Sequence, residues 1–489
     1  MATYLDSLQK NATKTGRTEN GAVTHSTTSN EVLNFFALAG AMRGNIDKAR
    51  TLFRKAYQED KQLAVRVLFY LRDVRGGQGE RQLFRELFRD LTRMDLAVAE
   101  KVLAFIPVYG RWDDLISVYG FGGLQEAAKN LIAEQLNADR IALARDDSVS
   151  LLAKWLPSEN ASSVNSRVQA RQIASDLGLS NRDYRKKVVA LRKKIGLLEQ
   201  SMSKNEWDAI QYGKIPSQAG RKHAKAFRRH DNDRFDAFMN RVVSGEETLN
   251  AGTLFTYEVV DIVRKGDNLA ADAFWKSLPD YTNGNNALVV ADTSGSMGSL
   301  GYRYGVGPQP IDVSVSLALY FAERNTGAFK NYFLTFSSQP ELVKVVGATL
   351  TEKLQNISTA NWSMNTDIQA VFNLLLKSAK NADATAEDMP KVIYIISDMQ
   401  FDRSTHNSGL TAFENAKQQY EAAGFTLPHI VFWNVSARDT NVPVTKNEGN
   451  VTLVSGLSQS TFRYVVEGKT PLQSMLDILN GERYAPITV

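Results

Sequence analysis

The spacing of apolar residues divides the chain into two parts. From about residue 30 to 280, apolar residues recur at steps of three and four, as in 31–42, 62–72 and 81–91, which is the period of an amphipathic helix. Short breaks with Gly, Pro or Asp, such as RGGQGE at 75–80, separate these segments. Many helices joined by short turns predict an all-α, HEAT-like helical repeat over residues 30–282.

After Asn283 the apolar residues gather in short, nearly continuous runs instead. These runs are predicted strands at 286–292, 330–336, 391–398 and 427–435, and amphipathic stretches at 311–324, 366–379 and 410–423 lie between them. Strands that are buried on both faces and alternate with helices predict an α/β, doubly wound, Rossmann-like domain over residues 283–489. Such a fold binds its ligand at the carboxyl ends of its strands.

The N-terminal residues 1–29, rich in Thr, Asn, Ser and Gly, predict a flexible arm with no apolar run of signal-peptide length. No later stretch reaches the roughly 18 continuous apolar residues that a membrane helix needs. The chain of 489 residues has no cysteine, which excludes disulfides, thiolate zinc sites and cysteine nucleophiles. We therefore expect a cytoplasmic protein without a membrane partner.

The stretch VVADTSGSMG at 289–298 carries candidate chemistry. Asp292 ends the first predicted strand, so Asp292, Ser294 and Ser296 leave the sheet where the ligand site is expected. Gly295 lets the backbone bend so that both hydroxyls face the same point as the carboxylate. One carboxylate and two hydroxyl oxygens suit a hard divalent cation such as Mg²⁺, or Mn²⁺ or Ca²⁺ in its place.

Two later residues complete this metal set. Thr366, in MNTD at 364–367, opens a predicted helix, and Asp398 ends the VIYIIS strand as Asp292 ends its own. The Asp-x-Ser-x-Ser, Thr, Asp arrangement resembles the metal-ion-dependent adhesion site (MIDAS) of von Willebrand factor type A (vWA) domains, over roughly residues 284–480. The insert at 298–310 departs from that pattern. A capped helix start without a metal is the alternative interpretation.

Enzyme signatures are missing from the sequence. A haloacid-dehalogenase phosphatase needs a second acid two residues after its aspartate, where this chain has Ser294. There is no phosphate-binding Gly-x-x-x-x-Gly-Lys-Ser/Thr loop and no Gly-x-Ser-x-Gly nucleophile elbow. We therefore predict a protein that is not an enzyme, with a hydrolase using Asp292 and Asp398 around Mg²⁺ as a less favoured hypothesis.

Positive charge is concentrated in the helical half. Residues 161–245 contain 18 Lys/Arg against 8 Asp/Glu, although the formal charge of the whole chain is only +5. A predicted helix at 183–199 turns an apolar stripe to the core and cations outward, and a second candidate helix at 221–230 stacks Arg221, Lys225, Arg228 and Arg229 at steps of three and four. A merely solvated face is the alternative, but unbalanced like charges repel and so indicate a polyanionic partner such as RNA. The predicted RNA contacts are Arg185, Lys186, Lys187, Arg192, Lys193, Lys194, Arg221, Lys222, Lys225, Arg228 and Arg229.

The order of the two halves resembles the Ro autoantigen family, in which a TROVE module of helical repeats precedes a vWA domain. The motifs LRDVRGGQGER, YGRWDDL, AKWLP, NTD and SDMQFD are most similar to an uncharacterised group of Ro-related proteins of phages, bacteria and plants. The resemblance implies a ring of helices that binds small structured RNAs and RNA 3′ ends. The loop RGGQGER at 75–81 is a candidate phosphate site, but a helix cap followed by a turn is the favoured interpretation.

The sequence thus predicts a non-catalytic, RNA-binding ribonucleoprotein or RNA quality-control scaffold with a divalent-metal site. The alternative is a protein-binding adaptor in which a carboxylate of a protein partner completes the Mg²⁺ coordination.

Overall fold

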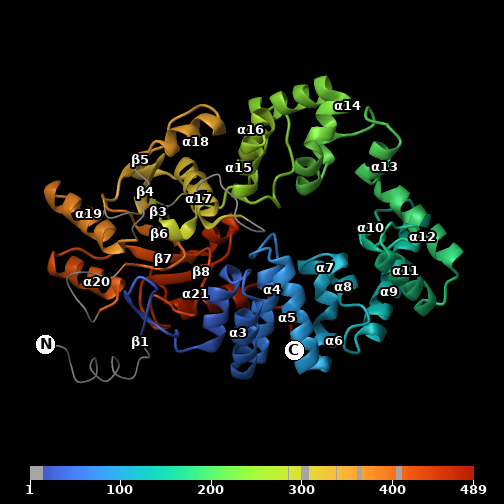
Figure 1. The fold of residues 1–489 in the computed structure, drawn as a ribbon, viewed down its shortest axis with the longest axis horizontal. Helices are drawn as coiled ribbons and strands as arrows, with labels where there is room; N and C mark the ends of the chain where they lie inside the picture. The colour runs from blue at the N-terminus through green and yellow to red at the C-terminus, as the bar shows by residue number, and fades with distance from the viewer. Residues whose placement is uncertain are drawn as a thin grey trace.

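A computed structural model describes residues 15–282, 284, 286–298, 308–336, 339–360, 366–402 and 410–489. Helices occupy the first half and a sheet with flanking helices the second, so the type of element changes where the pattern of apolar residues predicts. Figure 1 shows the helices leaving the sheet, running through an arc and returning to it. Most of the insert at 298–310 lies outside the described residues, as do Met364 and Asn365 of the MNTD motif.

Eleven described helices form the first section of the arc, and consecutive helices pack against each other from α2 to α6. Their amphipathic faces meet in one core, which confirms the predicted helices at 31–42, 62–72 and 81–91. The helices are α2 (Glu31–Leu38), α3 (Ile46–Glu59), α4 (Lys61–Arg72), α5 (Arg81–Met94), α6 (Leu96–Val102), α7 (Ile106–Tyr109), α8 (Trp112–Ser117), α9 (Gln125–Ala144), α10 (Leu152–Trp155), α11 (Val164–Asp176) and α12 (Asn181–Ile195).

The second section of the arc comprises α13 (Leu198–Ser203), α14 (Ser217–Ser244), α15 (Thr256–Arg264) and α16 (Asn268–Lys276). The prediction of one helix over 183–199 is wrong, because α12 ends at Gly196, whose φ of 66° is left-handed. The predicted helix at 221–230 is part of α14, which is interrupted at Asp231. Within the described ranges, no helix has the length and apolar character needed to cross a membrane.

The sheet has six strands in the order β5-β4-β3-β6-β7-β8, and every neighbouring pair is parallel except β4 with β5. The strands are β3 (Ala287–Asp292), β4 (Tyr332–Phe336), β5 (Leu342–Lys344), β6 (Val392–Ser397), β7 (His429–Asn434) and β8 (Val451–Ser455). Four of them confirm the predicted strands. The edge strand β5 and the last strand β8 are additions that the apolar runs do not indicate.

Helices cover both faces of the sheet, as a doubly wound fold requires. Alternate residues of β3 enter opposite cores: Val289 and Ala291 pack with α17, while Leu288 and Val290 pack with α19 and α20. The helices of this half are α17 (Pro310–Arg324), α18 (Leu350–Ser358), α19 (Ile368–Asn381), α20 (Ala412–Ala422) and α21 (Pro471–Asn480). Because the strands are buried on both faces, their sequences are continuous apolar runs and do not alternate between apolar and polar residues.

The hydrophobic cores do not separate at residue 282, where the sequence predicts a domain boundary. One core combines α14, α15 and α16 with one face of the sheet, including α17. Another combines α2 to α12 with the C-terminal segment around α21. Because α2 also contacts β8, and α15 contacts α17, both ends of the helical arc are attached to the α/β half. The helices and the sheet therefore close a ring of elements (Figure 1).

The glycine loop at 75–81 forms part of this closure. The Ser460 hydroxyl donates to the carbonyl of Gly77 over 3.1 Å, and the buried Gln78 amide reaches the Ser455 hydroxyl over 3.3 Å. The Tyr464 hydroxyl donates to the carbonyl of Gly76. The loop is a turn between α4 and α5 that contacts the α/β half, in agreement with the favoured interpretation.

The N-terminal segment differs from the predicted flexible arm over residues 15–29. Strands β1 (Thr15–Arg17) and β2 (Val23–His25) form an antiparallel hairpin. Single bridges join it to the α/β half, from Gly21 to Asp402 and from His25 to Val442. Composition alone indicates an arm, because the partners of these polar residues lie about 400 residues later in the chain.

Candidate metal centre and nucleic-acid interface

The predicted acids meet at the centre of the sheet. Asp292 is the last residue of β3, and Asp398 follows β6, the strand paired with β3 in parallel. From β3 the chain builds the sheet outward through β4 and β5, and then on the other side through β6, β7 and β8. The carboxyl ends of β3 and β6 therefore lie at the switch point, where doubly wound folds bind ligands.

Asp292 is fully buried and held in place by two donors. The Ser397 hydroxyl donates to its Oδ2 over 2.5 Å, and the backbone N–H of Ser294 donates to its Oδ1 over 2.9 Å. Burial, and after it the negative charge of Asp398, raises the pKa of Asp292 to about 7. Ser397 is a site residue that was not predicted from the sequence. The feature that could have indicated it is a polar residue at the end of an otherwise apolar strand, directly before the acid.

Asp398 presents an unsatisfied oxygen to the same place. It is 1% exposed, and the N–H of Gln400 donates to its Oδ1 over 3.2 Å. Its Oδ2 has no hydrogen-bond partner among the described residues. Burial raises the pKa of Asp398, while the Ser296 side chain, as a hydrogen-bond partner, lowers it. A buried carboxylate oxygen without a donor is costly unless a cation or a proton satisfies it.

Three hydroxyl groups were predicted beside the two acids, those of Ser294, Ser296 and Thr366. Ser294 and Ser296 lie 3.0 Å apart through their Oγ atoms. Thr366 Oγ1 donates to Asp402 Oδ1 over 2.9 Å and accepts from the side-chain amide of Asn20 over 2.9 Å. One lone pair of the Thr366 hydroxyl remains for a further partner.

The structure thus brings four predicted ligands together: Asp292, Ser294, Ser296 and Asp398. Thr366 adjoins them through Asn20, whose amide also donates to the carbonyl of Gln400, two residues after Asp398. Asp402 and Asn20 were not predicted. Asp402 lies within the SDMQFD motif, but Asn20 carries no signal of its own.

The donor set fits a hard divalent cation. The described residues contain no group of three or more His, Cys, Asp and Glu side chains that could hold a metal. The candidate set differs from such groups because it combines two carboxylates with hydroxyls, and its acids come from adjacent strands. Oxygen donors of this kind suit Mg²⁺, and Asp398 Oδ2, which accepts no hydrogen bond from a described residue, gives the cation a buried negative partner.

Mg²⁺ is expected to raise the melting temperature strongly at about pH 8 and weakly at about pH 5.5. The pKa of Asp292 is raised from 3.8, its ordinary value, to about 7 in the folded protein. The protonated carboxyl therefore stabilises the metal-free fold, fully below about pH 4. This contribution is lost as the pH rises through about 7 and Asp292 becomes charged. Above that pH a bound cation would take the place of the proton. Differential scanning fluorimetry measures the shift, and Asp398→Asn is expected to abolish it. Equal shifts at both pH values would contradict the site.

The predicted RNA contacts divide into free and engaged cations. Seven of the eleven are exposed and make no ion pair with any described residue: Arg185, Lys186, Lys187, Lys193, Lys222, Lys225 and Arg229. The other four are partly buried and take part in contacts within the protein: Arg192, Lys194, Arg221 and Arg228. The free cations form two groups, one on α12 and one on α14.

The engaged cations correct the prediction for those positions. Arg192 donates to the carbonyls of Ala153 and Leu156 over 2.8 and 2.6 Å, and burial lowers its pKa. Lys194 pairs with Asp146 over 2.5 Å. Arg221 pairs with Glu258, and Arg228 with Asp267. A helical stripe shows which side chains leave their own core, but not which acids neighbouring helices supply.

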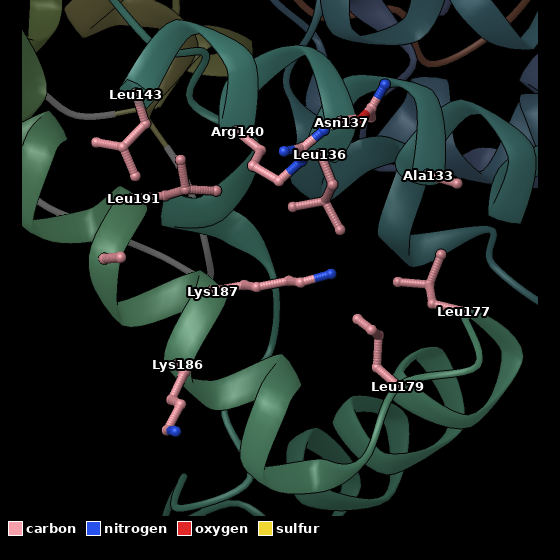
Figure 2. A pocket seen from close by; sticks show the side chains of 11 residues that line it. Ala133, Leu136, Asn137, Arg140, Leu143, Leu177, Leu179, Lys186, Lys187 and Leu191 are labelled. Atoms are coloured by element: carbon pink, nitrogen blue, oxygen red, sulfur yellow. Dashed lines mark hydrogen bonds between the residues drawn. The ribbon is translucent and has the colours of Figure 1, made fainter. Parts of the chain in front are cut away.

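A cavity of about 400 Å³ lies beside the free cations of α12. Leucines of α9, of the segment after α11 and of α12 line it, including Leu136, Leu179 and Leu191. Figure 2 shows Lys187 extending across this space, with Arg140 of α9 on the opposite wall, whereas Lys186 points away. Arg140 is exposed and was not predicted, because it lies outside the basic region. The cavity therefore combines an apolar lining with a cationic rim.

The aromatic residues near the basic helices are mostly core. Tyr184, Tyr212 and Phe227 are at most 5% exposed, so they are not accessible for stacking on bases. Trp207 is partly exposed and stacks on His230, with ring centroids 4.4 Å apart. The preference for core packing over base stacking is confirmed for the three buried rings.

Comparison with known families places the chain. The model of the family described as "Domain of unknown function (DUF2828)" matches residues 18–93 and 121–291, which together make up half of the chain. The chain belongs to the DUF2828 family. A second model, "Domain of unknown function (DUF7788)", matches residues 286–478 of this DUF2828 member, the part that contains the sheet and the candidate metal centre.

Two similar proteins cover nearly all of this DUF2828 member. "Uncharacterized protein L728" of Acanthamoeba polyphaga mimivirus is 27% identical over 515 residues, which span 96% of this chain and 88% of that protein. Among solved structures, the Deinococcus radiodurans RO (RSR) protein matches with a TM-score of 0.48 and 14% identity. The match covers 93% of this chain and 100% of that chain.

Proposed function

We propose that this DUF2828 protein is a non-catalytic scaffold that binds RNA through its helical half. The observation that carries the proposal is the group of free cations on α12, namely Arg185, Lys186, Lys187 and Lys193. The protein satisfies the charges of their neighbours Arg192 and Lys194 internally, but leaves these four in solvent. Uncompensated cations on one helix repel each other, and phosphates remove that repulsion.

The cavity beside α12 favours an unpaired nucleotide as part of the ligand. A base can lie against the leucines while Lys187 and Arg140 contact the flanking phosphates. Duplex RNA keeps its bases stacked inside and can use only the cationic rim. We therefore propose that single-stranded ends or loops of RNA bind here, in line with the resemblance to the Ro family.

A divalent cation is a second component of the proposal. Asp292, Ser294, Ser296 and Asp398 would hold it, with Thr366 at the side of the site. When bound, it supplies positive charge to two buried carboxylates whose pKa values are raised. Ser397 and the N–H of Ser294 keep the Asp292 carboxylate in position, so its oxygens are oriented before the cation arrives.

Fluorescence anisotropy with a labelled, single-stranded RNA of about 20 nucleotides tests the RNA proposal. Five phosphate contacts, from the four free cations of α12 and from Arg140, predict that log K falls with log salt with a slope of about −3.5. The binding is expected to persist in Asp398→Asn, because the metal site lies in the other half of the protein. A lack of binding at about 50 mM salt, or a slope near zero, would contradict the proposal.

A further inference from the structure

The turn of the N-terminal hairpin lies on the candidate metal centre. Thr18 Oγ1 donates to the carbonyl of Phe401 over 2.7 Å, and the N–H of Glu19 donates to Gln400 Oε1 over 2.8 Å. The Asn20 amide donates both to Thr366 Oγ1 and to the carbonyl of Gln400, each over 2.9 Å. Three consecutive residues of the turn are thus fixed to the segment that follows Asp398.

This attachment carries a carboxylate to the site. Arg438 Nη1 donates to Glu19 Oε2 over 2.9 Å, and Nη2 of the same guanidinium donates to the carbonyl of Ser296 over 2.9 Å. Its Nε lies 4.0 Å from Asp398 Oδ2, the buried oxygen that has no hydrogen-bond partner. One cationic side chain therefore lies between Glu19, the backbone of Ser296 and Asp398, and it offsets the two carboxylate charges that a bound cation would neutralise.

We propose that Glu19 is the protein's own carboxylate ligand for the metal centre, delivered by the hairpin turn, and that Arg438 takes the cation's place when no metal is bound. The Glu19 side chain is exposed, and among the described residues its ion pair is with Arg438, so its carboxylate can exchange Arg438 for a metal at little cost. In the proposed metal-bound state, the buried Asp398 oxygen, the two serines and Glu19 would supply oxygen donors to the cation.

The role of Glu19 rests on the proposed metal site. If Glu19 is a ligand, it limits which other carboxylates can bind the metal. In the adaptor alternative, a carboxylate from another protein fills the open coordination position. Here a carboxylate of the same chain is already tethered beside that position, so an outside carboxylate must first displace the hairpin. The metal centre then fastens the N-terminal segment to the α/β half.

Mn²⁺ binding to the full-length protein tests the inference, with free Mn²⁺ measured by electron paramagnetic resonance. Glu19→Gln is expected to weaken Mn²⁺ binding about tenfold or more. Glu448→Gln is the matched control, because it removes the same charge and breaks an ion pair of the same kind, with Lys417. The control is expected to bind Mn²⁺ within about twofold of the unchanged protein.

A second pair of variants separates a ligand from a residue that only holds Arg438 away. Arg438→Gln removes the competing cation and is expected to strengthen Mn²⁺ binding. If Glu19 is a ligand, adding Glu19→Gln to Arg438→Gln still weakens binding about tenfold. If Glu19 acts only through Arg438, the added substitution has no effect, and the inference is overturned.

The Mn²⁺ measurements also separate failure of the Glu19 role from failure of the metal site. Mn²⁺ binding that Asp398→Asn abolishes but Glu19→Gln leaves unchanged overturns the role of Glu19, while the metal site stands. An unchanged protein that binds no Mn²⁺ overturns the metal site and the role of Glu19 together. Neither result bears on RNA binding, which the anisotropy measurement tests separately.

Discussion

A variant of α12 with four charges reversed is expected to bind single-stranded RNA about 1,000-fold more weakly at about 50 mM salt. It carries glutamate at Arg185, Lys186, Lys187 and Lys193. Each phosphate contact with a single strand contributes about 0.7 decades of affinity per tenfold drop in salt, and about 50 mM lies about 1.3 decades below 1 M, so four contacts account for more than three decades. Because these side chains are exposed and form no ion pair with any residue that the structure describes, we expect the fold to survive, and circular dichroism checks that it does.

The control for this variant reverses the same number of charges elsewhere. Exposed lysines of the α/β half serve for it: Lys330, Lys377, Lys380 and Lys391. Both variants have the same net charge, so a difference between them reports position and not total charge. Anisotropy titrations should show near-normal affinity and an unchanged salt slope for the control. Equal losses in the two variants would mean that RNA responds only to net charge, and the site on α12 would be rejected.

Asp114→Ala is expected to lower the free energy of unfolding by about 3–5 kcal/mol. The Asp114 carboxylate is fully buried and accepts from Arg72 Nε and Arg85 Nε, each over 2.7 Å. It also accepts from the N–H of Arg111 over 3.0 Å, which caps α8. Alanine leaves the Arg72 guanidinium, 5% exposed, without its charge partner. Urea unfolding followed by tryptophan fluorescence measures the loss.

The matched control is Glu126→Ala, which breaks the Lys129 ion pair on the surface of α9. The Glu126 side chain is 71% exposed, so this pair is expected to contribute less than about 0.5 kcal/mol. If Asp114→Ala were no more destabilising than Glu126→Ala, the buried ion-pair cluster would not stabilise this part of the helical arc.

The sequence was sufficient to predict elements whose cause is local. Apolar periodicity predicted the helical character of residues 30–280, three of its helices and four strands, and the acid at the end of each central strand indicated the metal candidates. Asp292 and Asp398 were predictable together because carboxyl ends of neighbouring parallel strands share one edge. Ser294 and Ser296 followed from their position in the same turn.

Features that depend on distant segments could not be predicted in this way. Glu19 and Asn20 lie in a polar segment, and only their contacts with Gln400 and Thr366 give them a place at the site. In the same way, Arg192 and Arg228 have the helical positions of surface cations, but neighbouring segments supply oxygens that engage them. The hydrophobic cores that the two halves share could not be predicted from local sequence either, because α14 to α16 complete their packing on the sheet.

The central claim is that RNA lies on α12 and in the adjoining leucine-lined cavity. Crosslinking of a bound, 4-thiouridine-containing single-stranded RNA, followed by mass spectrometry of the crosslinked peptides, tests it most directly. We expect crosslinks within residues 133–143 of α9 and 177–194 around α12, and their loss in the charge-reversed variant. Crosslinks confined to residues 286–489, or unaffected by the reversed charges, would contradict it.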